Sequence, residues 1–547
     1  MIMAKINIRV IAPIAAALLT FSATSCVSDL DTAPISPKID MDSTPEGVFN
    51  KCYAVLAMAG NGDGDTGDVN SDVKGYSDEG MTNLVRLMWN ANELTTDEAV
   101  CGWGDNGLDQ LVVNTYDDSN QMMKAYFSRV GLAIDNCNFY LTTFADHDAT
   151  MTAEVRFLRA LYYSIWLDAF GNVPFSETVG SATRYTRAEL FDWLVNELKT
   201  NVEPNLSAAK AKKSGDANYG RVDKAAAWLL LARLYLNAEV YTGTPHWAEA
   251  RSYAEQVINS DYQLNTQPKN GWSAYQMLFM GDNGETDAAK EAIFPIIQNS
   301  KDIRSYGNSL YLIASTFKDD MHASPFDPSS VNGCVSAAWA GNRARPNLVA
   351  KFFPQGDAPV TESYNMPLAA GDDRAIFWSI DRTYDCEKIS DFTNGYSVCK
   401  FVNFKTDGSV PYNPSFADTD FFLMRIAEAY LTYAEADARL NGNKTTQQGT
   451  IYVNAIRSRA NASTRDASRD SYSTDDILDE WSREFYFEGR RRTDLIRYNK
   501  FGGNNSYTWQ WKGNDYKGTS FPAYRNLFPI PTNELNSNSS LIQNPGY

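Results

Sequence analysis

Residues Ala153–Phe175, AEVRFLRALYYSIWLDAFGNVPF, form the stretch of sequence that decides the fold. Their apolar side chains recur at steps of three and four residues, so a helix would carry them as one broad stripe. Thr152 is the predicted N-cap, and Gly171 and Pro174 are expected to end the helix. The charged residues of the stretch are expected on its solvent-facing surface: Glu154, Arg156, Arg159 and Asp168. A helix with so wide an apolar stripe needs other helices packed against it.

Other segments supply the expected partner helices. The predicted pairs are the hairpin Lys224–Ser260, the helices Phe421–Leu440 and Gln447–Ala462, and the helices Thr152–Phe170 and Arg187–Lys199. Bulky residues on one helix of a pair face small residues on the other, which is close to the tetratricopeptide pattern. The pairs are scattered along the chain rather than in tandem. The predicted fold class is mainly α, with tetratricopeptide-like helix pairs forming a helical core that long, irregular, loop-rich insertions interrupt.

The largest insertion spans residues 262–420 and contains few helical patterns. It carries several Trp and Tyr residues among many Gly, Asn, Asp and Ser residues. Loops of this length in a compact domain usually have functions.

Residues 1–25 have the pattern of an export signal. Lys5 and Arg9 give a positive start, and residues 10–21 form an apolar run too short to span a bilayer. Small residues precede Cys26, as in a lipoprotein processing site, although Ala23 stands where leucine is usual. The alternative is an ordinary secretory cleavage in which Cys26 is incidental. We therefore expect a removed signal peptide over residues 1–25, an acylated Cys26, a tether over residues 26–46 and one domain over residues 26–547.

Composition and charge exclude several functions. The chain has 547 residues, of which 44% are hydrophobic and 21% charged, as in an ordinary folded protein. Its net charge of −18 repels nucleic acids and anionic lipid surfaces. Seven cysteines without a C-x-x-C pair form neither a disulfide scaffold nor a zinc site. Buried thiols are expected, and a bridge between Cys386 and Cys399 stays open.

The sequence contains no recognisable catalytic or metal motif. Its three histidines are far apart, and the nucleophile and phosphate-binding motifs are missing. Glu484 and Glu488 lie one turn apart on a helix expected from about Asp475 to Tyr498, beside several arginines. That spacing predicts lateral ion pairs and not the facing carboxylates of a glycosidase. We expect no catalytic residue and no cofactor.

An acidic, glycine-rich loop at residues 60–72 is faintly similar to a calcium-binding loop. Thr66 stands at the position that needs glycine, and Asp72 replaces the closing glutamate. A solvated loop is therefore predicted. Structural calcium stays open, but no clear motif supports it.

Aromatic residues make up 13% of the chain, and many of them lie in loops. Trp103 lies between Gly102 and Gly104 and has few apolar neighbours in the sequence, so it is either buried in the core or exposed to a ligand. Carbohydrate rings have an apolar face that Trp and Tyr can cover, while Arg, Asn and Asp bind the hydroxyls. The aromatic loops therefore favour carbohydrate binding, which needs neither a nucleophile nor a metal.

Several blocks of sequence resemble the SusD/RagB family, and they run from Cys26 to the last residue. The most specific are the stretch 153–175, GRVDKAAAWLLLARLYLNAEVY at Gly220–Tyr241, RIAEAYLTYAEADA at Arg425–Ala438, WSREFYFEGRRRTDLIRY at Trp481–Tyr498, and the ending Pro529–Pro531 with Gln543–Tyr547. The resemblance implies a lipid-anchored, surface-exposed outer-membrane protein that captures a glycan and is not an enzyme. It also implies a SusC-like TonB-dependent transporter as partner, which imports the captured oligosaccharide.

The resemblance extends to a starch-binding member of the family, whose aromatic arc can be carried over by position. Trp103 and Asn106 match its W-x-x-N segment, and Tyr306 matches its R-x-Y-G segment. Trp339 aligns upstream of its V-x-K-F-F segment, and Arg86 precedes its N-E-L-x-T-D-E block. The resemblance thus implies starch or another α-glucan as ligand, with rings stacked on the three aromatics and hydroxyls bound by Arg86 and Asn106.

Other interpretations remain for the arc. Cys101 stands where the starch binder has an additional Trp, so a different glucan such as dextran could use the same arc with a more open pocket. A secreted glycoside hydrolase would need facing carboxylates in the aromatic face. A protein-interaction scaffold would bind no glycan and would bury Trp103 and Tyr306 in the core.

Overall fold

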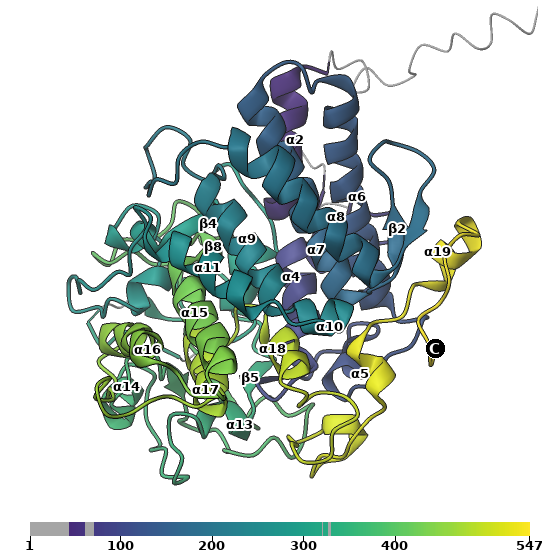
Figure 1. Ribbon diagram of the computed structural model, residues 1–547. Helices are drawn as coiled ribbons and strands as arrows, with labels where there is room; N and C mark the ends of the chain where they lie inside the picture. The colour runs from purple at the N-terminus through teal and green to yellow at the C-terminus, as the bar shows by residue number, and fades with distance from the viewer. Residues whose placement is uncertain (1–42, 61–70, 320, 327–329) are drawn as a thin grey trace, which may run out of the picture. The chain divides into compact units, whose positions relative to one another are not determined.

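The structure, a computed structural model, describes residues 43–60, 71–319, 321–326 and 330–547 (Figure 1). The predicted signal peptide, Cys26, most of the tether and most of the acidic loop at 60–72 lie outside the described residues. The chain divides into two units, residues 1–48 and 49–547. Helix α2 (Pro45–Ala57) begins in the first unit and ends in the second. All contacts given below lie within the second unit.

The predicted helix pairs are present, and the mainly helical fold class is confirmed. The pairs are α7 (Ala149–Ala169) with α8 (Arg187–Glu197), α9 (Lys224–Leu236) with α11 (Trp247–Ile258), and α15 (Ile426–Leu440) with α16 (Gln447–Arg459). Helix α6 (Gln121–Thr143) also packs along α7. Helix α11 packs on α15, so residues far apart in the sequence bring two pairs together (Figure 1). Stacked pairs of this kind bury one shared apolar face, as in helical repeat proteins.

Helix α7 begins one turn earlier than predicted. Its N-cap is Asp148, whose side chain accepts a hydrogen bond from the Met151 N–H at 2.7 Å. Thr152 lies inside the helix, and its hydroxyl donates to the Ala145 carbonyl instead. The prediction of Thr152 as the N-cap was wrong because an aspartate four residues earlier caps the helix equally well.

Two charged residues of α7 are buried and not on the predicted solvent-facing surface. Arg159 forms an ion pair with Glu197 of α8 at 3.1 Å, and Glu154 forms one with Arg221 at 2.7 Å. These side chains join α7 to its neighbours through ion pairs, while the apolar stripe fills the core between helices. A buried charge is tolerated only when it is paired in this way.

The helix predicted from about Asp475 to Tyr498 is two helices, α17 (Thr474–Phe485) and α18 (Arg491–Arg497). Phe487 and Gly489 have φ values of 63° and 79°, a left-handed conformation that a helix cannot contain. Glu484 and Glu488 therefore do not form lateral pairs along one helix. Both are buried and bind arginines from other elements, so the structural role was predicted correctly and the geometry was not.

The insertion 262–420 folds into short elements. They are η5 (Gln276–Phe279), η6 (Asp287–Glu291), β4 (Ala292–Ile296), α12 (Asn308–Ala314), β5 (Asn342–Ala344), α13 (Pro346–Val349), α14 (Met366–Ala370), β6 (Phe377–Trp378) and β7 (Tyr396–Val398). The four-stranded sheet has the order β1-β5-β7-β6, and β1 (Ala99–Cys101) is antiparallel to β5 with Cys101 opposite Asn342. Strand β4 pairs with β8 (Phe421–Arg425). The insertion is thus joined to the body of the protein by two sheets.

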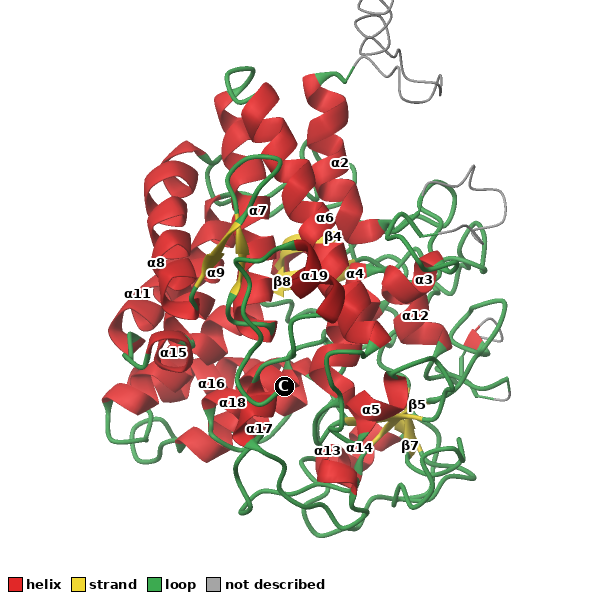
Figure 2. Cartoon of the chain, turned by 90° about the vertical axis from the view of Figure 1, so that its right-hand side faces the viewer, coloured by secondary structure: helices red, strands yellow, loops and turns green. Residues whose placement is uncertain are grey.

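The other elements connect these parts. They are α3 (Glu79–Thr82), α4 (Leu84–Trp89), η2 (Asn90–Leu94), α5 (Leu108–Val112), β2 (Val173–Phe175), β3 (Thr183–Tyr185), η3 (Leu198–Val202), η4 (Glu203–Asn205), α10 (Ala238–Thr242), η8 (Lys512–Asn514), η9 (Ala523–Asn526) and α19 (Thr532–Ser537). Helix α4 packs against both α3 and α12, and Figure 2 shows these three on the same side as β5 and β7. This side carries the candidate site.

None of the cysteines in the described part forms a disulfide, so the bridge between Cys386 and Cys399 that the sequence left open is not formed. Every one of them except the half-buried Cys334 is buried. Among the described residues, none of the helices combines the length and the apolar character that crossing a bilayer requires.

Candidate functional site

The three predicted arc aromatics lie together in the structure. The rings of Trp103 and Trp339 have their centroids 6.3 Å apart, and the rings of Trp339 and Tyr306 are also 6.3 Å apart. Successive ring planes are turned by 63° and 56°, so the three rings form a bent series and not a flat wall. All three side chains are half-buried, which leaves part of each ring open to solvent. Residues from three separate segments therefore form one aromatic arc.

Helix α12 is the element that brings Tyr306 and Trp339 together. Tyr306 lies two residues before the helix begins, and the Trp339 N–H donates to the Ala314 carbonyl at its end at 2.7 Å. The N–H groups of Ala340 and Asn342 continue this contact by donating to Phe317 and Ser315. The segment of Trp339 is thereby held in place although it has no helix or strand of its own.

Strand β1 places the third aromatic. Trp103 follows Cys101, the last residue of β1, whose partner strand β5 begins three residues after Trp339. The Trp103 indole lies directly against the Gly341 backbone, which has a φ of 108°. A side chain at position 341 would need both an unusual backbone conformation and the space that the indole occupies. The pairing of β1 with β5 thus fixes how Trp103 and Trp339 approach each other.

The predicted polar residues take different positions. The Arg86 guanidinium lies over the rings of Trp103 and Tyr311, at 5.6 and 5.0 Å from their centroids. It also forms an ion pair with Asp105 at 2.5 Å, and Arg86 is only 6% exposed. Asn106 directly follows Asp105 in the chain and is exposed. Arg86 therefore supports the arc from beneath more than it faces a ligand, while Asn106 is free to reach one.

Asp105 is a site residue that the sequence reasoning missed. Its side chain is 31% exposed, and it lies two residues after Trp103 at the edge of the arc. A carboxylate in this position can accept hydrogen bonds from sugar hydroxyls while it pairs with Arg86. An acidic residue in a glycine-rich loop gives little signal by itself, because its partner Arg86 is known only from the fold.

Cys101, where the starch-binding relative was expected to carry another Trp, is buried under the arc. It is 2% exposed, and burial raises the pKa of its thiol to about 12. The thiol is therefore uncharged at neutral pH and behaves as a small apolar side chain.

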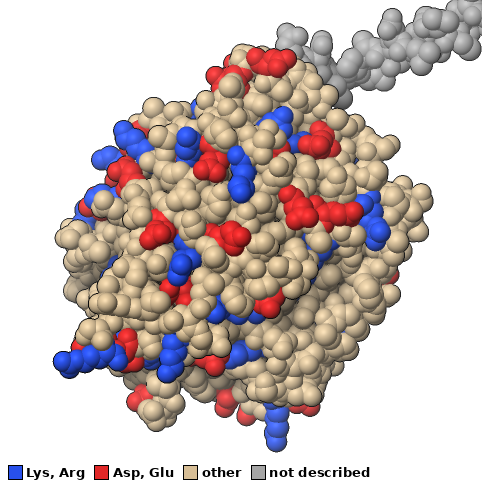
Figure 3. Space-filling view, viewed as in Figure 1, with Lys and Arg blue, Asp and Glu red and all other residues tan. Residues whose placement is uncertain are grey.

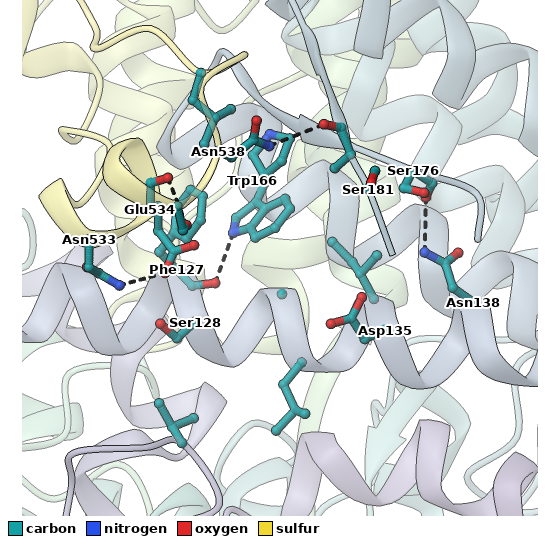
Figure 4. Close-up of a pocket in the computed structure, with 18 of the residues that line it drawn as sticks. Phe127, Ser128, Asp135, Asn138, Trp166, Ser176, Ser181, Asn533, Glu534 and Asn538 are labelled. Atoms are coloured by element: carbon teal, nitrogen blue, oxygen red, sulfur yellow. Dashed lines mark hydrogen bonds between the residues drawn. The ribbon is translucent and has the colours of Figure 1, made fainter. Parts of the chain in front are cut away.

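A separate pocket of about 820 Å³ lies between α6, Trp166 of α7 and the C-terminal segment around α19 (Figure 4). Hydroxyl and amide groups such as Ser128 and Asn538 line much of it, and none of the predicted site residues does. Its tryptophan, Trp166, is 5% exposed and donates its indole N–H to the Phe127 carbonyl at 3.2 Å. The aromatic residues that line the pocket, Phe127, Tyr163 and Trp166, are all buried, so it offers no open aromatic face for a sugar ring to stack on.

The acidic residues weighed for catalysis are occupied structurally. Arg425 contacts Glu484 at 2.5 Å and Glu488 at 2.7 Å, and Lys400 also contacts Glu488 at 2.7 Å. Among the described residues, no group of three or more His, Cys, Asp or Glu side chains is arranged to hold a metal ion. The arrangement at the arc is suited to binding a ring-shaped, polyhydroxylated ligand.

Comparison with known proteins identifies the family. A family model described as the SusD family matches residues 244–547. The chain is 37% identical to the starch-binding protein SusD of Bacteroides thetaiotaomicron, and the match covers 97% of each protein. The chain belongs to the SusD family. It is also 24% identical to the SusD-like protein P25 of Formosa agariphila, over 76% of this chain and 78% of that protein.

Solved structures of SusD-like proteins share the fold. The surface glycan-binding protein A of Bacteroides uniformis superposes with a TM-score of 0.64 and 21% identity, covering 91% of this chain and 98% of that one. The corresponding protein of B. thetaiotaomicron, solved with laminarihexaose, gives a TM-score of 0.61 and 18% identity over 92% and 99% of the chains. At these identities the likeness concerns the fold alone.

Membership of the SusD family gives the function at the level of class. Proteins of this family bind glycans at the cell surface and are not catalysts, and this chain is one of them. The predicted family, the general role and the non-enzymatic character are therefore confirmed.

Proposed function

We propose that this SusD-family protein binds starch or a similar α-glucan on the arc of Trp103, Trp339 and Tyr306. The observation that carries the proposal is the spacing of these rings, each within 6.3 Å of the next, in a chain 37% identical to a starch-binding protein. An α-linked glucan is naturally curved. A bent series of aromatic rings therefore fits an α-linked glucan better than it fits a straight polysaccharide. Each ring offers an apolar face to the C–H groups of one or more glucose units.

Polar groups at the edge of the arc supply hydrogen bonds in this proposal. Asn106 and Asp105 are placed to bind hydroxyls, and Arg86 holds both Trp103 and Asp105 in position. Binding on an open arc costs the protein little rearrangement but also encloses little of the ligand. We therefore expect weak binding per site, with long polysaccharides held more tightly because one chain meets many protein molecules.

Attachment and delivery complete the proposed role. We propose that Cys26 carries the lipid anchor in the outer membrane and that a SusC-like TonB-dependent transporter receives the captured oligosaccharide. Family membership supports this part, together with the export signal and the small residues before Cys26. A second candidate ligand is dextran, because the buried Cys101 removes the extra aromatic ring of the starch binder and leaves the arc shorter.

Affinity electrophoresis tests the ligand. Residues 27–547 are run through native gels that contain amylopectin, dextran or laminarin, beside the variants Trp103→Ala and Trp247→Ala. Trp247 is a half-buried tryptophan at the start of α11, so its removal controls for a general loss of stability. Removal of a central aromatic contact typically costs about 2 kcal/mol, or roughly thirtyfold in affinity.

Retardation by amylopectin that disappears in Trp103→Ala and persists in Trp247→Ala is the expected result. Retardation by dextran alone would keep the arc but replace starch by an α-1,6-linked glucan. Retardation by laminarin alone would contradict the α-glucan assignment. Equal retardation of both variants would show that the arc does not bind the polysaccharide.

A further inference from the structure

The backbone at Tyr306 is held by a buried carboxylate, that of Glu79. One oxygen of Glu79, the first residue of α3, accepts a hydrogen bond from the Tyr306 N–H at 2.6 Å. The other oxygen accepts from the Ser305 hydroxyl at 2.9 Å, and Glu79 is 2% exposed. A glutamate is rarely buried to this degree unless its oxygens are fully used. Here both oxygens bind two consecutive residues that lead into the arc.

Further contacts fix the Glu79 segment against the backbone around Tyr306. Gly80 follows Glu79, and a Cβ at Gly80 would lie 3.0 Å from the Tyr306 Cβ, so the two segments are in tight contact. Asn83 accepts a hydrogen bond from the Asn308 N–H at 3.1 Å on the other side of Tyr306. The short segment from Glu79 to Asn83 thus fixes the chain both before and after the tyrosine.

Few charges compensate Glu79. Asp78 is adjacent and of the same sign, and Arg129 of α6, a cation that acts on Glu79, is already paired with Asp72 at 2.6 Å. Burial, and to a smaller extent the neighbouring Asp78, raise the pKa of Glu79, while the two hydrogen bonds and Arg129 lower it, and the net result is a pKa of about 7. The Glu79 carboxyl group therefore changes its charge within the pH range in which binding can be measured.

We infer that Glu79 is a positioning residue of the glycan site, which holds the Tyr306 backbone so that its ring completes the arc. This inference rests on the proposed function. An ionised carboxylate is the stronger acceptor, because hydrogen bonds to a charged oxygen are shorter and stronger than those to a neutral one. When Glu79 takes up a proton, one of its oxygens becomes a donor, and the Ser305 hydroxyl must turn to accept from it. The hold on Tyr306 is then weaker, and the affinity for the glucan falls.

The test is a pH profile of maltoheptaose binding, measured by calorimetry at pH 8.0 and pH 5.5. The unmodified protein is expected to bind about threefold more weakly at pH 5.5, the size of change that a weakened charge-assisted hydrogen bond gives. Glu79→Gln should bind equally at both values, at the level of the unmodified protein at pH 5.5. In a Tyr306→Ala background, Glu79→Gln should cause no further loss, because Glu79 acts through Tyr306.

Glu154→Gln is the matched control. Glu154 is also 2% exposed, and burial likewise raises the pKa of its carboxyl group, but it lies on α7 and binds Arg221. This variant should keep the pH profile of the unmodified protein. A profile in Glu79→Gln as steep as that of the unmodified protein would overturn the inference, and so would a further loss of affinity in the Tyr306→Ala background.

Thermal denaturation separates this inference from the proposed function. Because the pKa of Glu79 is raised in the folded protein, its ionisation costs stability as the pH rises towards 7 and above. The Tm of Glu79→Gln minus the Tm of the unmodified protein should therefore increase between pH 5.5 and pH 8.0. If maltoheptaose binds at neither pH while this increase is present, the starch proposal fails and the buried, titrating Glu79 stands. A constant difference in Tm would refute the titration of Glu79 itself.

Discussion

Arg86 shows how one side chain can organise a binding surface that it scarcely faces. Its guanidinium lies over Trp103 and Tyr311 and contacts Asp105 at 2.5 Å. Such a cation–π contact is stronger when the cation is shielded from water, as it is here. The Tyr311 hydroxyl in turn donates to Asn90 at 2.7 Å, which connects this cluster to the helical body. The arc is therefore held from beneath by polar contacts as well as by packing.

We predict that Asp105→Ala weakens maltoheptaose binding by about 1.5 kcal/mol, roughly tenfold, because it removes a sugar acceptor and releases Arg86. Asp105→Asn should lose less, since its amide oxygen still accepts a hydrogen bond. Calorimetry measures both. Asp109→Ala, at an exposed position in α5, is the control and should bind like the unmodified protein. Equal affinity in all three variants would mean that Asp105 does not contact the ligand.

At the scale of elements, α17 is joined to the rest of the protein through Glu484. Arg425 at the end of β8 contacts it at 2.5 Å, Arg374 contacts it at 3.2 Å, and Arg459 of α16 is also bound to it. Burial alone would raise the pKa of Glu484, but the three arginines outweigh burial and lower it to about 2. A carboxylate shared by three arginines replaces apolar packing at the point where α16, α17 and β8 meet.

Glu484→Gln is therefore expected to lower the free energy of unfolding by about 3 kcal/mol at pH 7, because three buried arginines lose their shared partner. The folded pKa lies below the ordinary value of 4.5, so this stabilisation is complete above that pH and is lost as the pH falls towards 2. Urea unfolding should show a smaller difference in the free energy of unfolding between variant and unmodified protein at pH 3 than at pH 7. Glu239→Gln, at an exposed position in α10, should change stability little at either pH. A deficit that stays the same at pH 3 would contradict the role given to the ionised carboxylate.

At the scale of the whole molecule, the distribution of charge bears on the choice of partner. The chain has a net charge of −18, yet acidic and basic side chains are interspersed on the face shown in Figure 3. A neutral polysaccharide needs no field of one sign to reach the protein. The proposed role also needs attachment to the membrane, for which Cys26 is the proposed site.

We predict that Cys26→Ser releases the protein from the membrane fraction of the expressing cells, because acyl chains on that cysteine are the proposed attachment. Fractionation followed by immunoblotting measures this. The soluble variant should bind maltoheptaose with unchanged affinity, since the arc belongs to residues 49–547. Cys334→Ser, which alters a half-buried cysteine of the described residues, should remain in the membrane fraction. Retention of Cys26→Ser there would show that another feature holds the protein.

Some features of the fold depend on contacts that no local pattern in the sequence contains. Asp148 and Thr152 can both cap a helix, and only the path of the chain before α7 selects Asp148. The segment Trp481–Tyr498 is helical in pattern throughout, but Phe487 and Gly489 turn the chain so that Glu484 and Glu488 face Arg425. Glu154 and Arg159 are polar by type, and their burial depends on partners that lie 67 and 38 residues away.

The sequence by itself determined the helix pairs, the loop-rich insertion and the family. These follow from apolar periodicity and from motifs, which depend on near neighbours in the chain. Which aromatics are displayed was decided only by the tertiary structure. Trp89 is buried while Trp103, fourteen residues later, stands in the arc, because β1 pairs with β5 and α12 brings Tyr306 and Trp339 to the same place. Strand pairing and hydrogen bonds between residues far apart in the chain leave no local pattern, so from the sequence these three aromatics could be named only through the family resemblance.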